Sequence, residues 1–152
     1  YRHCACIVLC LLISALNITV VRSYANREVE ISPPLETFAT DGKILLPIEK
    51  INDGNLHRFQ YKTSGGTAVR YIVIKKSGTA YGVGLDACDI CGASGYYQRK
   101  DQVICKLCDV VMNKSTIGFP GGCNPVPLRF GIAQGHMVIM AADLEAEKQR
   151  FQ

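Results

Sequence analysis

A chain of 152 residues has room for one compact domain and an appendage. Its 48% hydrophobic and 20% charged residues exclude a disordered, highly charged protein. The 17 basic and 13 acidic residues are scattered, without the basic cluster typical of a nucleic-acid interface, so we expect no nucleic-acid partner.

The first 25 residues contain an uncharged, apolar segment. Residues 4–21, if helical, extend for about 27 Å at about 1.5 Å per residue. Because a hydrocarbon core is about 30 Å thick, we predict a transmembrane helix or signal anchor over residues 1–25. A cleaved secretory signal is the alternative, since small residues near the end of the segment suit a signal peptidase. Free thiols in such a segment act as small apolar side chains, which is our interpretation of Cys4, Cys6 and Cys10.

The next segment is polar and lacks any regular periodicity. Residues 26–42 contain the pair Pro33-Pro34, which predicts an extended connector. We therefore expect the folded, cysteine-rich β domain to occupy residues 43–142.

Short apolar stretches separated by turn residues characterise this domain. Turns are indicated by pairs such as Ser77-Gly78 and Gln134-Gly135. The regular spacing predicts a mainly β fold, a small antiparallel barrel or sandwich. Strands are expected at 43–48, 56–63, 68–76, 79–87, 95–99, 102–105, 126–133 and 136–142.

The tail has a different pattern. Asp143 is a suitable N-cap, acidic residues follow it, and basic residues come later in residues 143–152. This order predicts a short C-terminal helix.

Two Cys-x-x-Cys units dominate the domain. Cys88 and Cys91 form the first, Cys105 and Cys108 the second, and 13 residues separate them. Two intervening residues let both thiolates of a unit point toward one ion, while Gly92 allows the required backbone turn. Four thiolates in this pattern indicate a metal site. The spacing leaves an iron–sulfur cluster, zinc and copper open as alternatives.

A fifth cysteine lies in a loop rich in Gly and Pro. Residues 118–128 are expected to form a rigid, exposed loop that folds over the site. Cys123 could replace a metal ligand, cover the metal or form a disulfide. Asp86 and Asp89 flank Cys88 and could tune the charge of the site or simply cap backbone amides.

Disulfides of an exported domain are the alternative to a metal site. The paired two-residue spacings count against that alternative, and an odd fifth cysteine leaves at least one thiol without an intrachain disulfide. No Ser-His-Asp set, nucleotide-binding loop or pair of catalytic carboxylates stands out, so hydrolytic chemistry has no support.

The segment 56–128 resembles the carboxy-terminal domain of the FtrD-like membrane iron–sulfur protein family. The shared motifs occur in order along the chain: the double Cys-x-x-Cys, Gly95-Tyr96, Val111-Met112-Asn113, and the loop Gly121-Gly122-Cys123-Asn124-Pro125. A looser resemblance links the two ligand loops and the Gly/Pro-rich loop to Rieske domains. Cysteines replace the two Rieske histidines here, and all-thiolate ligation would lower the reduction potential.

The family resemblance implies a protein of the bacterial cytoplasmic membrane that serves iron acquisition, with the cysteine-rich domain outside the membrane. Its implied partners are an iron permease, a periplasmic iron-binding protein and ABC-transporter components. We therefore expect an electron-transfer or metal-binding subunit rather than a stand-alone enzyme. The alternative function is a redox-silent module that binds zinc, copper or iron and docks to a transporter or membrane complex.

Overall fold

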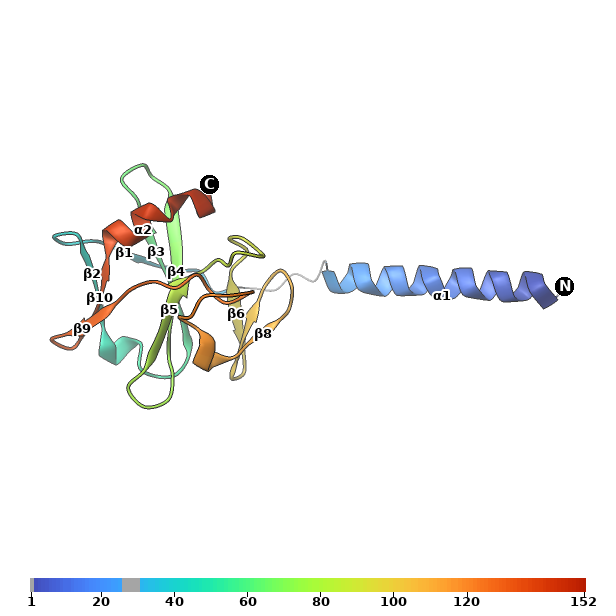
Figure 1. Cartoon of the computed structure of the whole chain (residues 1–152), viewed down its shortest axis with the longest axis horizontal. Helices are drawn as coiled ribbons and strands as arrows, with labels where there is room; N and C mark the ends of the chain where they lie inside the picture. The colour runs from blue at the N-terminus through green and yellow to red at the C-terminus, as the bar shows by residue number, and fades with distance from the viewer. Residues whose placement is uncertain (1, 26–30) are drawn as a thin grey trace.

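The computed structural model describes residues 2–25 and 31–152, with side chains described for residues 6–17 and 31–152. The apolar segment forms helix α1 (Arg2–Ala25), which contains no Gly or Pro (Figure 1). Within the described part of the chain, no helix has the length and apolar character needed to cross a membrane. The predicted transmembrane helix is therefore not supported. Residues 26–30 of the predicted connector lie outside the described residues.

A four-stranded sheet with the order β1-β3-β4-β5 forms the centre of the domain. Strands β3 (Leu56–Lys62), β4 (Ala68–Lys75) and β5 (Tyr81–Leu85) are antiparallel neighbours. Strand β1 (Leu35–Thr37) pairs in parallel with β3 and lies within the segment predicted to be a connector. The Thr37 hydroxyl donates a 2.8 Å hydrogen bond to the backbone carbonyl of Gln60 and fixes this pairing.

Strand β4 is buried on both faces, which explains its uninterrupted apolar run. Side chains alternate across a strand, so Tyr71 and Val73 face one hydrophobic cluster while Ile72 and Ile74 face another. All four side chains are fully buried. The central sheet therefore divides the domain into two halves.

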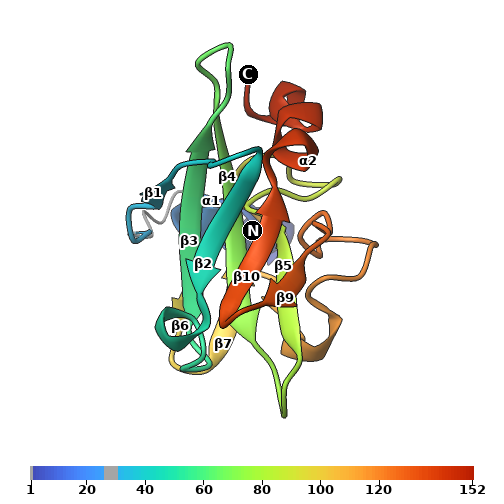
Figure 2. The same cartoon turned by 90° about the vertical axis from the view of Figure 1, so that its left-hand side faces the viewer.

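The first half is closed by a second sheet with the order β2-β10-β9. Figure 2 shows β2 (Lys43–Pro47), β10 (His136–Met140) and β9 (Gly131–Ala133) lying across the central sheet. Alternate side chains of β2 and β10 point inward to the core. Those that enter the main hydrophobic cluster are Ile44, Leu46, Met137 and Ile139.

The second half contains a third sheet with the order β6-β7-β8. Its strands are β6 (Tyr96–Arg99), β7 (Gln102–Cys105) and β8 (Val111–Met112), followed by the short 3₁₀ helix η2 (Lys114–Thr116). Tyr96, Val103 and Met112 pack against Ile72 and Ile74 of β4. The cysteine-bearing loops belong to this half of the domain.

The chain ends in helix α2 (Ala141–Ala146) and the 3₁₀ helix η3 (Lys148–Phe151); another 3₁₀ turn, η1 (Ile48–Lys50), follows β2. The prediction of a short C-terminal helix is confirmed. Its predicted cap is wrong, because α2 begins before Asp143 and has Met140 at its N-cap. The Asp143 carboxylate instead accepts a 2.5 Å hydrogen bond from Arg129.

The mainly β prediction is confirmed, but the described strands form three small sheets and no closed barrel. A Rieske-like fold is likewise not supported. The difference arises from long-range pairing: β2 pairs with β10, whereas β6, β7 and β8 pair only among themselves. Local apolar patterns locate strands without specifying such partners.

Candidate metal centre

The first cysteine loop is a tight turn just after β5. The Cys88 amide donates to the Gly92 carbonyl at 3.1 Å, and the Gly92 amide returns a bond to the Cys88 carbonyl at 3.0 Å. Gly92 has a φ of 61°, a left-handed conformation that glycine adopts without steric cost. Within the turn, the Cys91 amide donates to the Cys88 sulfur at 3.1 Å. The turn therefore supplies two thiols and one donor aimed at sulfur.

The second cysteine loop is a similar turn, which follows β7. The Cys105 amide donates to the Val110 carbonyl, and the Asp109 amide donates to the Cys105 carbonyl, each at 3.0 Å. Asp109, which follows Cys108 as Gly92 follows Cys91, also has a positive φ, of 56°. The two turns thus share the bond back to the carbonyl of the first cysteine and the positive φ after the second cysteine. They differ in the other bond, because the Cys88 amide reaches four residues ahead and the Cys105 amide reaches five.

The third loop carries Cys123 and is held against β5. The Val126 carbonyl accepts from Leu85 at 2.7 Å, and the Val126 amide donates to the Ala87 carbonyl at 3.0 Å. A Cβ on Gly84 would come within 2.8 Å of the Pro125 Cβ, so only glycine permits this contact. The anchoring places Cys123 beside the other two loops, as the sequence predicts for this segment.

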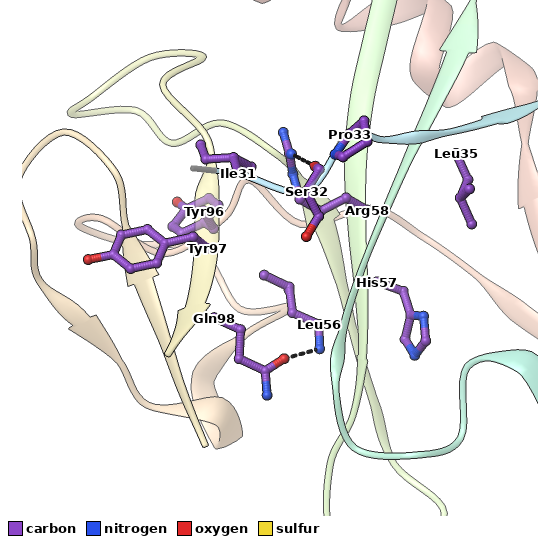
Figure 3. Close-up of a pocket in the computed structure, with 10 residues that line it drawn as sticks. All are labelled: Ile31, Ser32, Pro33, Leu35, Leu56, His57, Arg58, Tyr96, Tyr97 and Gln98. Carbon is purple, nitrogen blue, oxygen red and sulfur yellow. Dashed lines mark hydrogen bonds between the residues drawn. The ribbon is translucent and has the colours of Figure 1, made fainter. Parts of the chain in front are cut away.

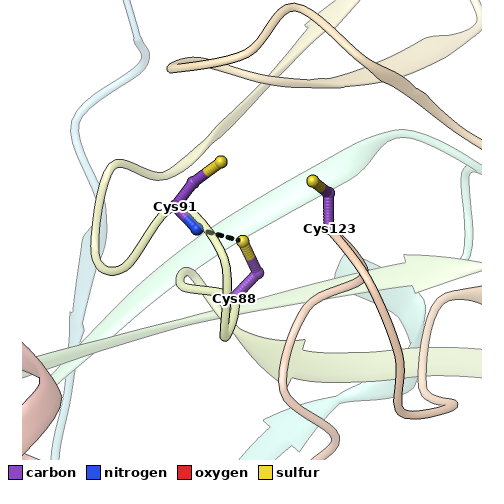
Figure 4. A group of neighbouring side chains, drawn as sticks. All are labelled: Cys88, Cys91 and Cys123. Carbon is purple, nitrogen blue, oxygen red and sulfur yellow. Dashed lines mark hydrogen bonds between the residues drawn. The ribbon is translucent and has the colours of Figure 1, made fainter.

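The structure brings all five sulfurs together in two overlapping groups. The Sγ atoms of Cys88, Cys91 and Cys123 lie within 4.8 Å of one another, and so do those of Cys91, Cys105 and Cys108. Cys91 belongs to both groups. The Sγ atoms of Cys108 and Cys123 are 3.7 Å apart. Figure 4 shows the first group, with its side chains converging from two separate loops.

The site is apolar on one side and open on the other. Cys88 and Cys105 are 2% and 1% exposed and belong to the hydrophobic cluster beneath the third sheet. Cys108, by contrast, is exposed. Ile90 and Leu107, each the second intervening residue of a Cys-x-x-Cys unit, are 70% and 67% exposed. Cys88 and Cys105 are thus shielded from water by apolar side chains, whereas Cys108 is accessible to solvent.

Close contact among the thiols shifts their pKa values in opposite directions. Burial, followed by hydrogen bonds with Cys108 and Cys105, raises the pKa of Cys91. A hydrogen bond with Cys108, followed by burial, raises the pKa of Cys123. Partial burial opposes ionisation of Cys108, but hydrogen bonds from the Val110 amide and neighbouring thiols outweigh it and lower its pKa. A metal ion must therefore displace protons from the neighbours of Cys108.

Asp86 fixes the base of the first cysteine loop. It is fully buried and pairs with Arg58 of β3 at 2.5 Å and with Arg70 of β4 at 3.3 Å. Its other oxygen accepts the Tyr96 amide at 2.8 Å. Asp86 therefore links β3, β4 and β6. The sequence suggested a cap for backbone amides, and the structure adds two ion pairs to that role. Asp89 is exposed and pairs with Arg150 at 2.9 Å.

Tyr96 links the thiols to a neighbouring cavity. Its ring is buried in the cysteine-containing cluster, and its hydroxyl donates to the Cys123 carbonyl at 2.7 Å. Burial, followed by the nearby Cys88, raises the pKa of this hydroxyl. Tyr96 also lines a cavity of about 320 Å³ between the segment before β1, strand β3 and strand β6 (Figure 3).

Sequence reasoning missed Tyr96, Arg58 and Arg70 as supports of the site. The Gly95-Tyr96 pair was visible only as a family motif. A charged residue within a largely apolar strand, such as Arg70 in β4, is a usable signal for a buried ion pair, because unpaired buried charge is strongly unfavourable.

The residues present fit a thiolate-bound metal or cluster. The donors are soft thiolates, they converge from three loops, and backbone amides approach the sulfurs. When bound, an iron–sulfur cluster supplies one-electron redox chemistry. Cys88, Cys91, Cys105 and Cys108 would hold it, with Cys123 beside them, while Asp86 and Tyr96 keep their loops in place.

The fold and the site define a small, mainly β protein with a cluster of thiols that could hold a metal ion. The family model described as "Membrane iron-sulfur containing protein FtrD-like" matches residues 51–151, more than half of the chain. The chain therefore belongs to the FtrD-like family of membrane iron–sulfur proteins, and the family prediction is confirmed. No curated protein and no solved structure matches the chain.

Proposed function

We propose that this protein carries an iron–sulfur cluster on Cys88, Cys91, Cys105 and Cys108 and transfers electrons in support of bacterial iron uptake. The observation that carries the proposal is the convergence of the cysteine sulfurs from three loops. Membership of a membrane iron–sulfur family supports the choice of cluster.

The arrangement of the thiols suits electron transfer. Cys88 and Cys105 are buried, which shields that side of the site from water, while Cys108 reaches the surface. Exposed apolar side chains, Ile90 and Leu107, stand in the two ligand loops and offer a contact surface to a redox partner. We place the domain outside the cytoplasmic membrane, with membrane attachment and with transporter components as partners.

The test is anaerobic purification of the full chain, followed by determination of iron and acid-labile sulfide. Visible absorbance that bleaches on reduction, together with an EPR signal, is the expected result. Colourless protein that contains zinc and no sulfide would exclude the proposed electron-transfer role.

A redox-silent metal module is the second candidate. The observation that favours it is the 3.7 Å contact between Cys108 and Cys123, which matches the edge of about 3.8 Å expected for a tetrahedral zinc–thiolate site with bonds of about 2.3 Å. Elemental analysis of the isolated protein separates this candidate from the first.

A further inference from the structure

Strand β9 leaves one edge of the second sheet open. It pairs with β10 on one side, and among the residues that the structure describes no strand pairs with its other side. Natural proteins commonly protect such an edge from association with charged residues or proline. Strand β2, at the opposite edge, carries Lys43 and Pro47, whereas β9 consists of Gly131, Ile132 and Ala133. All of β9 is exposed, Ile132 by 54%. It is therefore an apolar edge without this protection.

The register of β9 with β10 determines which backbone groups face the open edge. Ala133 pairs with His136 across the two-residue turn Gln134-Gly135, in which both residues have a positive φ. Such a closing pair exchanges both of its hydrogen bonds. Hydrogen-bonded and non-hydrogen-bonded pairs alternate along an antiparallel ladder, so Ile132 forms a non-hydrogen-bonded pair with Met137. The amide and the carbonyl of Ile132 therefore point away from β10, toward the open edge.

A second copy of β9 is complementary to this edge across a two-fold axis at Ile132. In this antiparallel arrangement each Ile132 amide donates to the Ile132 carbonyl of the other copy. The neighbouring position pairs Gly131 of one copy with Ala133 of the other. This pair is of the non-hydrogen-bonded kind, in which the Cα atoms are only about 4.5 Å apart. Gly and Ala have the smallest side chains, so the two strands can approach without a clash.

Charge is compatible with the same arrangement. Arg129, the charged residue nearest to β9 in the sequence, has a side chain that is 88% exposed. It lies three residues before Ile132, or about 10 Å along an extended chain. Antiparallel pairing therefore places the two Arg129 residues on opposite sides of the axis, each toward the uncharged turn Gln134-Gly135 of the other copy. Parallel pairing would instead place the two guanidinium groups side by side.

We propose that this protein forms a symmetric dimer in which the β9 strands of two copies pair antiparallel. The two three-stranded sheets then join into one continuous sheet. The cysteine-bearing cluster lies in the other half of the domain, beside β6 and β8 and away from β9 (Figure 1), so both thiol sites stay open to other partners. The contact is short, which places it in the weak class of interfaces that bury less than about 1,200 Å². The dimer requires no metal and is independent of the proposed electron-transfer function.

The test is sedimentation equilibrium of the full chain in detergent over a range of concentrations. Amide exchange at single residues is followed in parallel by mass spectrometry with electron-transfer fragmentation. We expect the protein mass to double as the concentration rises and the Ile132 amide to exchange more slowly over the same range, because it becomes a hydrogen-bond donor. A single chain at all concentrations up to about 1 mM overturns the proposal. A dimer in which this amide exchanges as fast as in the monomer also overturns it, because association then uses another surface.

Variants of Ile132 test the pairing directly. Ile132→Pro removes the amide that the dimer needs, while the monomer keeps its ladder with β10 because this amide faces the open edge. Its circular dichroism should match that of the unaltered chain, and the dimer should be lost. Ile132→Lys places two like charges on the axis and should also be monomeric, which provides a second variant if Ile132→Pro does not fold.

The matched control is Leu45→Lys. Leu45 is 49% exposed on β2, the opposite edge strand of the same sheet, so this variant should form the dimer as the unaltered chain does. A dimer that persists in folded Ile132→Lys contradicts the pairing through β9, and so does loss of the dimer in Leu45→Lys alone.

Discussion

Replacement of Asp86 by Asn is expected to lower the free energy of unfolding by about 3–5 kcal/mol, the range for removal of one partner from a buried ion pair. Asp86 is fully buried, and the Arg58 side chain that pairs with it is only 9% exposed. The substitution leaves this guanidinium buried without a counterion. At a urea m-value of about 2 kcal/mol/M, the loss corresponds to a midpoint lowered by about 2 M.

The matched control is Asp89→Asn, on the other side of Cys88. The Asp89 side chain is 60% exposed and pairs with Arg150, so its loss should change stability by less than about 1 kcal/mol. Both variants are unfolded in urea under reducing conditions, with equal metal content, and followed by circular dichroism. Equal midpoints for the two variants would show that the buried ion pair does not hold the three strands together.

Three further predictions concern the loops around the thiols. Chelation of bound metal should speed amide exchange in β6, β7 and β8 by about tenfold or more while β3 stays protected, because, of the two clusters formed by the described residues, the one beneath the third sheet contains the cysteines. Gly84→Ala should cost about 1–3 kcal/mol through overpacking, whereas Gly65→Ala, with open space around it, should be nearly neutral in urea unfolding. Tyr96→Phe should cost about 1 kcal/mol and speed alkylation of Cys123 about fivefold by removing a hydrogen bond, with Tyr97→Phe as the control.

Each of these predictions has a contradicting result. Uniform loss of amide protection on chelation would mean that the metal supports the whole domain rather than one half. Equal stability of the two glycine variants would show that the contact between β5 and the third loop has little energetic weight. Equal alkylation rates in the two tyrosine variants would mean that the Tyr96 hydroxyl does not restrain Cys123.

Strand positions could be predicted because they depend on local pattern. Residues 102–105 were expected as a strand and form β7 with the same bounds, and the turn at Gln134-Gly135 joins β9 to β10. Strand β1 could not be found in this way. Its three residues are too few for a periodic pattern, and they form a strand only because β3 offers an unpaired edge.

The convergence of the two Cys-x-x-Cys units was foreseeable from their spacing, but the grouping of the sulfurs was not. That grouping depends on where the third loop lies, and contacts between β5 and Pro125 and Val126 decide its position. Those contacts join residues about forty positions apart. The choice of ligands among the five cysteines remains a prediction.

Strand β4 links the stability of the fold to the properties of the site. Among the described residues, the cluster on one face of this strand contains no cysteine, so we expect this half of the domain to stay folded when the metal is absent. The other face packs in the hydrophobic cluster that contains Cys88 and Cys105. Substitutions at Tyr71 or Val73 should therefore act mainly on global stability. Substitutions at Ile72 or Ile74 should act on the site as well, because they alter the packing that holds two of the thiols out of water.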